Sequence, residues 1–119
     1  MDVRKDLNYR VLAIFAPVLI LTGLLGFVLP PGPMSNAPAY NIFHIVFGAI
    51  GGLLVLRGGD AGIRGFNIGF GIVDLYQAVA SFWGLFPAEY FRWKWGDDVL
   101  HVVIGAGLVA VGMAGRRRG

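Results

Sequence analysis

The chain has 119 residues; 56% of them are hydrophobic, and a further 19 are glycine. Only 17 side chains carry a formal charge, and none of the 46 positions between Arg10 and Arg57 does. Because a soluble domain of this length could not bury so much apolar surface, a soluble or disordered chain is excluded and a small multi-pass membrane protein is expected.

Four apolar segments follow one another along the chain, each near the length that a helix needs to cross a bilayer. A hydrocarbon core of about 30 Å requires roughly 20 helical residues, and only helices or closed barrels satisfy the backbone in lipid. Proline ends the first segment at Pro30 and the third at Pro87, because proline lacks the N–H that a helix interior needs. The sequence predicts an all-α polytopic membrane protein whose four transmembrane helices form two tandem hairpins, at about 11–29, 41–56, 65–86 and 98–114.

Lysine and arginine are distributed unevenly between the two sides of these spans. Eight of them lie before residue 11, in the 57–64 connection or in the C-terminal tail, and only Arg92 and Lys94 lie on the other side. The excess marks the cytoplasmic face, so both termini are predicted to be cytoplasmic, in the cell (inner) membrane. Since the basic residues flank spans, the net charge of +3 does not indicate a nucleic-acid partner.

The absence of cysteine excludes disulfides and thiolate metal sites.

The two halves of the chain align with each other when one is shifted by 57 positions. The aligned pairs include Pro30 with Pro87, His44 with His101, and Gly48 with Gly105. We interpret residues 1–57 and 58–119 as copies of one helical hairpin within a single domain, 1–119. Because each half crosses the membrane twice, the copies share an orientation, and the two histidines are expected at equal depth.

Small residues recur at four-residue spacing on three of the predicted helices. This spacing lets helix backbones approach closely in lipid, so it predicts tight helix packing. The residues are Gly48 and Gly52, Gly65 and Gly69, and Ala106, Ala110 and Ala114.

Each histidine is preceded, three positions earlier, by a polar residue: Asn41 lies before His44, and Asp98 lies before His101. In one interpretation Asn41 and Asp98 are N-caps, and the imidazoles of His44 and His101 lie at the third helical position and reach back toward the caps. That reading requires no ligand.

A second interpretation treats the two histidines as ligands. Imidazole binds haem iron, so His44 and His101 could hold a haem or a chlorin from both faces, with Gly48 and Gly105 one turn deeper leaving room beside the ring. A role in proton transfer or pH sensing is a third possibility for the same pair.

The third predicted helix carries a polar stripe. Asn67, Asp74, Gln77 and Ser81 are spaced by 7, 3 and 4 residues and therefore share one face. An ionisable group inside a bilayer indicates function by default, so the stripe and the histidines could form a proton path. The other interpretation is hydrogen bonding between helices of the bundle.

The sequence contains no phosphate-binding glycine loop, no zinc-protease motif and no nucleophile elbow, so enzymatic activity of this chain alone is not expected. The leading hypothesis is a structural or assembly subunit of a larger membrane complex, with other membrane proteins or further copies of itself as partners. The alternatives are a haem- or chlorin-binding protein and a proton or ion conduit along Asp74.

The two histidine motifs also carry a family resemblance. The residues are Asn41-Ile-Phe-His44 followed by Gly48 and Gly51-Gly52-Leu53, and Asp98-Val-Leu-His101 with Gly105. They resemble a family of small four-helix bacterial integral membrane proteins of unknown function, with Asn-x-x-His on the second helix and Asp-x-x-His on the fourth. The resemblance implies a four-helix fold in a membrane, and Asp74 has no counterpart in its pattern.

Overall fold

The computed structural model describes residues 6–115, of which 83% are helical, and no strand occurs within that range. Its helices are α1 (Leu7–Val28), α2 (Pro38–Arg57), α3 (Asp60–Trp83), the short α4 (Ala88–Phe91) and α5 (Trp95–Gly115). The predicted all-α class is confirmed. The tail arginines and the two basic residues before Asp6 lie outside the described residues.

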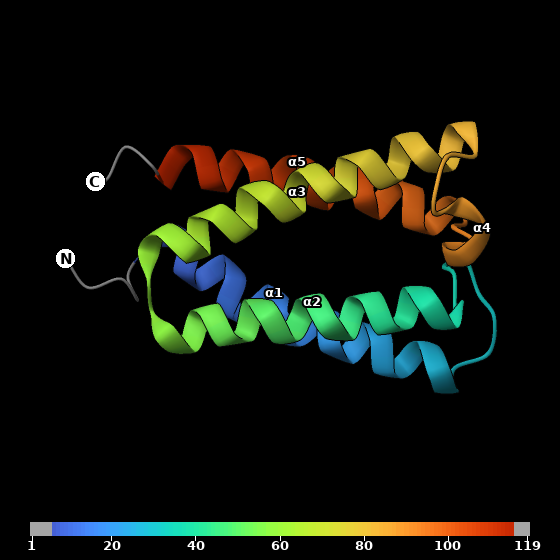
Figure 1. Ribbon diagram of the computed structural model, residues 1–119, viewed down its shortest axis with the longest axis horizontal. Helices are drawn as coiled ribbons and strands as arrows, with labels where there is room; N and C mark the ends of the chain where they lie inside the picture. Colours follow the sequence, from blue (N-terminus) through green and yellow to red (C-terminus); the bar gives the residue numbers. More distant parts are fainter. Residues whose placement is uncertain (1–5, 116–119) are drawn as a thin grey trace.

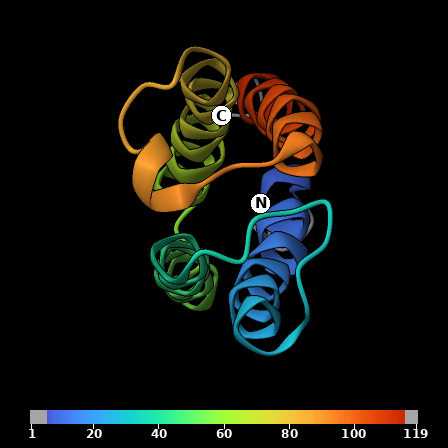
Figure 2. The same cartoon turned by 90° about the vertical axis from the view of Figure 1, so that its right-hand side faces the viewer.

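The four long helices form an antiparallel bundle built from two hairpins, α1 with α2 and α3 with α5 (Figure 1). The beginning of α1, the α2–α3 connection and the end of α5 lie at one end of the bundle. The loop between α1 and α2 lies at the opposite end, with α4 and the start of α5; below, this is called the loop end. Seen from the loop end, the four long helices occupy four corners (Figure 2). This is the up-down-up-down arrangement of simple four-helix bundles.

Local chemistry sets the helix ends and moves several predicted boundaries. The carboxylate of Asp6 accepts a hydrogen bond from the N–H of Asn8 at 2.7 Å, so α1 begins four residues before position 11. Gly58 and Gly84 end α2 and α3 with φ of 72° and 65°, which glycine adopts without steric cost. As a result α3 runs from 60 to 83 and not from 65 to 86, and the short α4 follows it, an element that the sequence did not predict.

The expectation that Asn41 and Asp98 cap their helices is wrong. α2 begins at Pro38, since proline suits the first helical position. Asn41 therefore lies inside the helix, and its side-chain amide donates to the carbonyl of Asn36 at 3.1 Å. Asp98 likewise lies within the first turn of α5. These two residues belong to the helices that they were expected to precede.

Three helices, α1, α2 and α5, are long and apolar enough to cross a membrane. They support a membrane protein built as a helical bundle. α3 has 24 residues but is less apolar, because its sequence includes polar or charged residues at Asp60, Arg64, Asn67, Asp74 and Gln77. Composition alone therefore does not identify α3 as a fourth span.

Glycines bring the helices of each hairpin together. A Cβ atom placed at Gly48 would lie 2.8 Å from the carbonyl oxygen of Ala16 on α1, and one at Gly105 would lie 2.8 Å from that of Gly71 on α3. The expectation that Gly48 and Gly105 leave room beside a bound ring is therefore wrong, because neighbouring helices fill that space. The predicted role of Gly48 in helix packing is confirmed, and Gly105, which was not part of the predicted small-residue pattern, packs in the same way.

The other residues of the predicted small-residue pattern do not make such contacts. A Cβ at Gly52, Gly65 or Gly69 would meet open space. The alanines at 106, 110 and 114 are exposed. Four-residue spacing thus predicted close packing at more positions than the bundle uses.

An aromatic cluster joins the two hairpins in the middle of the bundle. The Phe70 ring on α3 stacks on Phe66 and Phe43, with centroids 5.3 and 5.8 Å apart, and also packs against Phe15 and Phe47. Together with Leu19 and Leu108 this cluster forms an apolar layer across the bundle. Because aromatic side chains bury large areas, it is a substantial apolar contact between the hairpins.

The buried positions of the two hairpins correspond, at two different offsets. Those of α1 and α3 are 55 residues apart: Asn8, Leu12, Ala16 and Leu19 match Ile63, Asn67, Gly71 and Asp74. Those of α2 and α5 are 57 apart: Tyr40, His44, Gly48 and Gly51 match Asp97, His101, Gly105 and Leu108. The connection 84–94 is two residues longer than 29–37, which accounts for the change of offset. The duplication of halves 1–57 and 58–119 stays a prediction, one that these spacings favour.

Candidate functional site: a cavity between the hairpins

A cavity of about 560 Å³ lies between the two hairpins at the loop end. Both hairpins and the 30–36 loop line it, mostly with apolar side chains. The polar groups that converge on it include Tyr40 and His44 from α2, Asp74 from α3 and His101 from α5, all of them buried. The fold thus brings three of the predicted site residues, the two histidines and Asp74, to one cavity.

Tyr40 connects the two histidines. Its hydroxyl shares a 2.8 Å hydrogen bond with Nε2 of His101, and its ring centroid lies 4.2 Å from that of His44. Tyr40 is 1% exposed, so this contact is sheltered from water. Tyr40 was not predicted as a site residue, although it lies immediately before Asn41 and aligns with Asp97 in the repeat.

Burial decides which atom donates in the Tyr40–His101 bond. The Nδ1 atom of His101 is buried and has no partner within residues 6–115. A proton there would leave a buried N–H unpaired, which is costlier than an unpaired acceptor lone pair. We therefore assign the proton to Nε2, which donates to the Tyr40 oxygen. The hydroxyl of Tyr40 then donates to the side chain of Asp97, the acceptor that lies beside it.

His44 has a similar unsatisfied environment. Its Nδ1 atom is buried without a hydrogen-bond partner among the described residues. Its imidazole lies between the rings of Tyr40 and Phe43, with centroids 4.2 and 6.0 Å away. Buried polar groups in folded proteins are nearly always paired, so an unpaired imidazole beside a cavity indicates a place for a ligand or ordered water.

Asp74 ends a short hydrogen-bonded chain that comes from outside its helix. Trp93 Nε1 donates to Gln77 Oε1 at 3.0 Å, and Gln77 Nε2 donates to Asp74 Oδ1 at 3.2 Å. No ion pair of Asp74 occurs in the part of the chain that the structure describes. The Asp74 carboxyl group therefore borders the cavity, held by Gln77.

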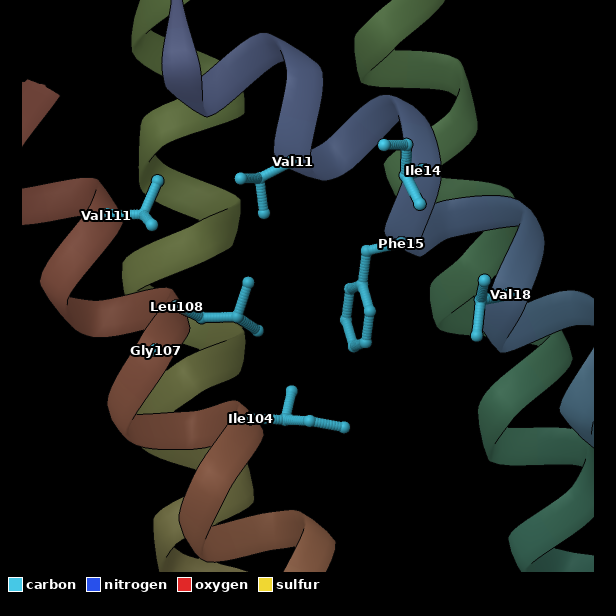
Figure 3. A pocket seen from close by; sticks show the side chains of 8 residues that line it. All are labelled: Val11, Ile14, Phe15, Val18, Ile104, Gly107, Leu108 and Val111. Atoms are coloured by element: carbon cyan, nitrogen blue, oxygen red, sulfur yellow. The ribbon is translucent and has the colours of Figure 1, made fainter.

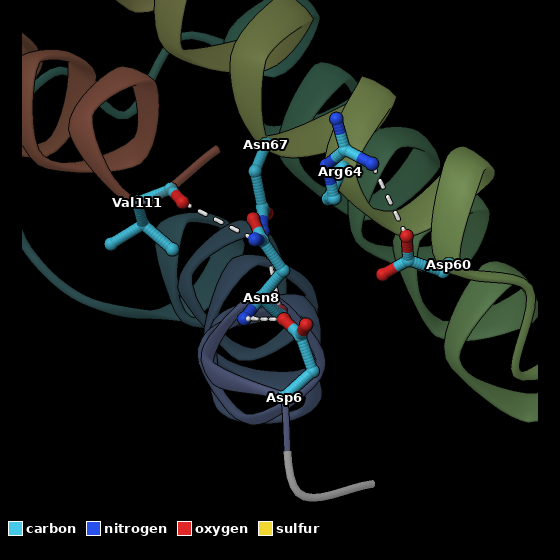
Figure 4. Close-up of polar contacts among 6 residues, drawn as sticks. All are labelled: Asp6, Asn8, Asp60, Arg64, Asn67 and Val111. Atoms are coloured by element: carbon cyan, nitrogen blue, oxygen red, sulfur yellow. Dashed lines mark hydrogen bonds and ion pairs between the residues drawn. The ribbon is translucent and has the colours of Figure 1, made fainter. Parts of the chain in front are cut away.

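The predicted polar stripe on α3 is divided into separate parts. Asn67 belongs to the other end of the bundle, where its Nδ2 donates to the side chain of Asn8 at 2.9 Å, while Asn8 donates to the carbonyl of Val111 (Figure 4). The apolar layer around Phe70 lies between this group and Asp74. Ser81 is half-buried and lies one turn beyond Gln77. These contacts match hydrogen bonding within the bundle and do not form a continuous path across it.

Asp97 ties the loops over the cavity end. Its Oδ2 accepts hydrogen bonds from the backbone N–H of Ser35 at 2.7 Å and of Lys94 at 2.9 Å. The Ser35 hydroxyl in turn donates to the carbonyl of Phe91. One fully buried carboxylate thus joins the α1–α2 loop to the start of α5. Asp98 was predicted as a site residue, whereas Asp97 was not.

The observed geometry does not favour two axial haem ligands. Nε2 of His101 is engaged by Tyr40, and the Tyr40 ring packs on His44, so a tyrosine occupies the space where a shared ring would lie. Within residues 6–115, no three histidine, aspartate or glutamate side chains cluster closely enough to hold a metal ion. The two histidines are better described as part of a hydrogen-bonding pocket.

The chain matches no family model, no curated protein and no solved structure. The resemblance carried by its two histidine motifs therefore stays a prediction.

Proposed function

We propose that the chain crosses the cell membrane of a bacterium four times, with both termini in the cytoplasm. α3 runs alongside α5 and connects the two ends of the bundle (Figure 1). Its polar residues Asn67, Asp74 and Gln77 are buried, whereas its exposed face carries apolar and aromatic side chains such as Ile72 and Phe82. Hiding the polar groups inside the bundle makes α3 compatible with lipid despite its lower hydropathy.

The described charges agree with this orientation. Arg10, Arg57 and Arg64 lie at the end of the bundle that holds the α2–α3 connection, and Arg92 and Lys94 lie at the loop end. Excess basic charge favours the cytoplasmic side. The cavity then opens near the outer face of the membrane.

Within this bundle we propose a binding function: the cavity holds a small uncharged ligand with hydrogen-bonding groups. The observation that carries the proposal is the convergence of Tyr40, His44, Asp74 and His101 on one cavity of about 560 Å³. A mostly apolar pocket of this size with a few convergent polar groups is the usual form of a small-molecule site. None of the described residues that line it is Lys or Arg, and Lys94 at its border directs its ammonium group to the Gly32 carbonyl at 3.1 Å, so the walls offer an anionic ligand no basic side chain. Binding requires no catalysis by this chain.

A conservative variant tests the binding function. Tyr40→Phe removes only the hydroxyl, and the matched control Tyr76→Phe removes a hydroxyl that donates to the Phe86 carbonyl outside the cavity. Protein purified from its native membranes is washed in detergent, extracted with organic solvent and assayed by mass spectrometry. We expect near-stoichiometric recovery of an uncharged small molecule from the wild type and from Tyr76→Phe, and a lower recovery from Tyr40→Phe, because losing a hydrogen bond worth about 1 kcal/mol weakens binding about fivefold. Wild-type protein without such a molecule, or equal recovery from both variants, would refute the proposal.

Assembly with other membrane proteins remains a second proposal, supported by a different surface. Gly65 and Gly69 on α3 and Ala106 and Ala110 on α5 are exposed, so these small residues are available to helices of other subunits or of a second copy. Stable co-purification from native membranes would support it, and a solitary monomer there would count against it.

A further inference from the structure

An apolar groove runs between α1 and α5 on the outside of the bundle (Figure 3). It has a volume of about 390 Å³ and is lined by apolar side chains of both helices and by Gly107. Ile14 and Val18 on its α1 side are 69% and 49% exposed. In the proposed topology this surface faces hydrocarbon, so the groove is open to the acyl chains of the bilayer.

The groove and the cavity border each other. Phe15, Val18 and Ile104 line both of them. In Figure 3 the Phe15 ring lies in the opening between α1 and α5. The cavity and the groove therefore adjoin along the seam between these two helices, with the Phe15 ring at their shared border.

The chemistry of the cavity restricts the head group that it can hold. The neutral imidazole of His44, whose Nδ1 atom has no partner among the described residues, can donate to a carbonyl, and the Asp74 carboxyl can accept from a hydroxyl. Phe15, Tyr40 and Phe70 give it aromatic walls that suit a planar ring. With no lysine or arginine among its described lining residues, a phosphate head group is disfavoured.

Resting on the proposed function, we infer that the ligand is an isoprenoid quinone or quinol. Its ring would occupy the cavity beside Tyr40, His44 and Asp74. Its tail would leave between α1 and α5 along the groove and reach the bilayer. The ligand would enter from the membrane by the same seam, because the opposite border of the cavity is the 30–36 loop at the polar end.

Gly107 allows the groove to be filled without disturbing the bundle. A Cβ there meets open space, so Gly107→Leu places a side chain in the groove and leaves the helix contacts intact. The matched control is Gly69→Leu on α3, which also meets open space but lines neither the groove nor the cavity.

Trp93 serves as the fluorescent reporter, because its ring lies 6.4 Å from that of His101. Trp83→Phe and Trp95→Phe in every protein remove the two exposed tryptophans.

The proteins are reconstituted in nanodiscs and titrated with decylubiquinone and with its tailless head, 2,3-dimethoxy-5-methyl-1,4-benzoquinone. We expect saturable quenching of Trp93 by both probes in the parent protein. Gly107→Leu should weaken binding of decylubiquinone about tenfold, because its tail would have to enter an apolar space that the leucine already fills. The same variant should change binding of the tailless probe less than about twofold. Gly69→Leu should change neither.

The outcomes separate this inference from the proposed function. If the tailless probe binds but Gly107→Leu leaves decylubiquinone binding at the parent value, the tail route is refuted. If neither quinone quenches saturably while an extracted ligand still depends on Tyr40, the quinone class is refuted and the binding function stands. If no extracted ligand depends on Tyr40 either, both fail together.

Discussion

Tyr40 shows how one side chain gives the two histidines a shared environment. His44 and His101 lie on different hairpins, and they interact through the phenol ring and its hydroxyl. Nearly complete burial makes every unpaired polar atom in this group costly, which is why a hydrogen-bonding ligand is a reasonable partner for it. The chemistry of the site therefore depends on Tyr40 as much as on the imidazoles.

The close helix contact at Gly105 leads to a stability prediction at the residue scale. In Gly105→Ala the new methyl group would lie 2.8 Å from the Gly71 carbonyl oxygen, so α3 and α5 must separate, and we expect a loss of about 1–3 kcal/mol in unfolding free energy. The neighbouring Gly107→Ala meets open space and should keep or raise stability by up to about 1 kcal/mol. Unfolding of the purified proteins by a denaturing detergent, followed by circular dichroism, measures both; equal stabilities would show that α3 and α5 do not pack as described.

At the scale of elements, the start of α5 is fixed by a side chain from its own first turn. Asp97 accepts the backbone N–H of Lys94, which immediately precedes the helix, and also that of Ser35 from the α1–α2 loop. The hydrogen bond from the Lys94 N–H is the acidic half of a capping box. The hydrogen bond from the Ser35 N–H connects the same carboxylate to the other hairpin. Asp97 therefore couples the start of α5 to the position of the α1–α2 loop.

Removing that carboxylate should loosen the loop end without unfolding the bundle. In Asp97→Ala the backbone N–H groups of Ser35 and Lys94 lose their acceptor, and we expect hydrogen exchange at both to accelerate about tenfold or more. Asp98→Ala is the matched control. The Oδ1 atom of Asp98 is buried and has no hydrogen-bond partner in the described part of the chain. Equal exchange in the two variants would show that Asp97 does not hold the loops.

For the whole molecule, the two hairpins are tightly packed internally and meet through the aromatic layer around Phe70. The cavity lies beside this layer at the loop end, where Phe70 and Asp74 of α3 face α1 and α2. A cavity between two packed units can open by a small shift of one unit against the other. The arrangement thus suits entry and exit of a ligand.

The topology of the whole molecule can be measured directly because the chain contains no cysteine. Gly59 and Glu89 are exposed and flank α3 on its two sides. In intact cells a membrane-impermeant maleimide should label Glu89→Cys nearly completely and Gly59→Cys hardly at all, with both labelled after lysis. Labelling of both variants in intact cells, or of neither, would show that α3 does not cross; labelling of Gly59→Cys alone would invert the orientation.

The sequence predicted the helices far better than it predicted their contacts. Proline and glycine end helices through their own backbone preferences, so the order of the four long helices could be read directly. Predicted boundaries moved by up to five residues, because caps such as Asp6 and the first-turn Pro38 act locally but were not recognised. Of the glycines chosen by spacing, Gly48 packs closely and Gly52 does not, because helix rotation decides which of them faces a neighbour.

Composition and periodicity by themselves determined that this chain is all-helical, that its apolar segments suit a membrane, and that the two histidines occupy matching places. They determined this because hydropathy, helix propensity and spacing are properties of the chain itself. Only the tertiary structure decided that Tyr40 joins the histidines, that Asn67 is separated from Asp74, and that a cavity and a groove meet at Phe15. Those features depend on how far each helix is rotated and how long the loops are, which together fix which side chains from distant segments face each other.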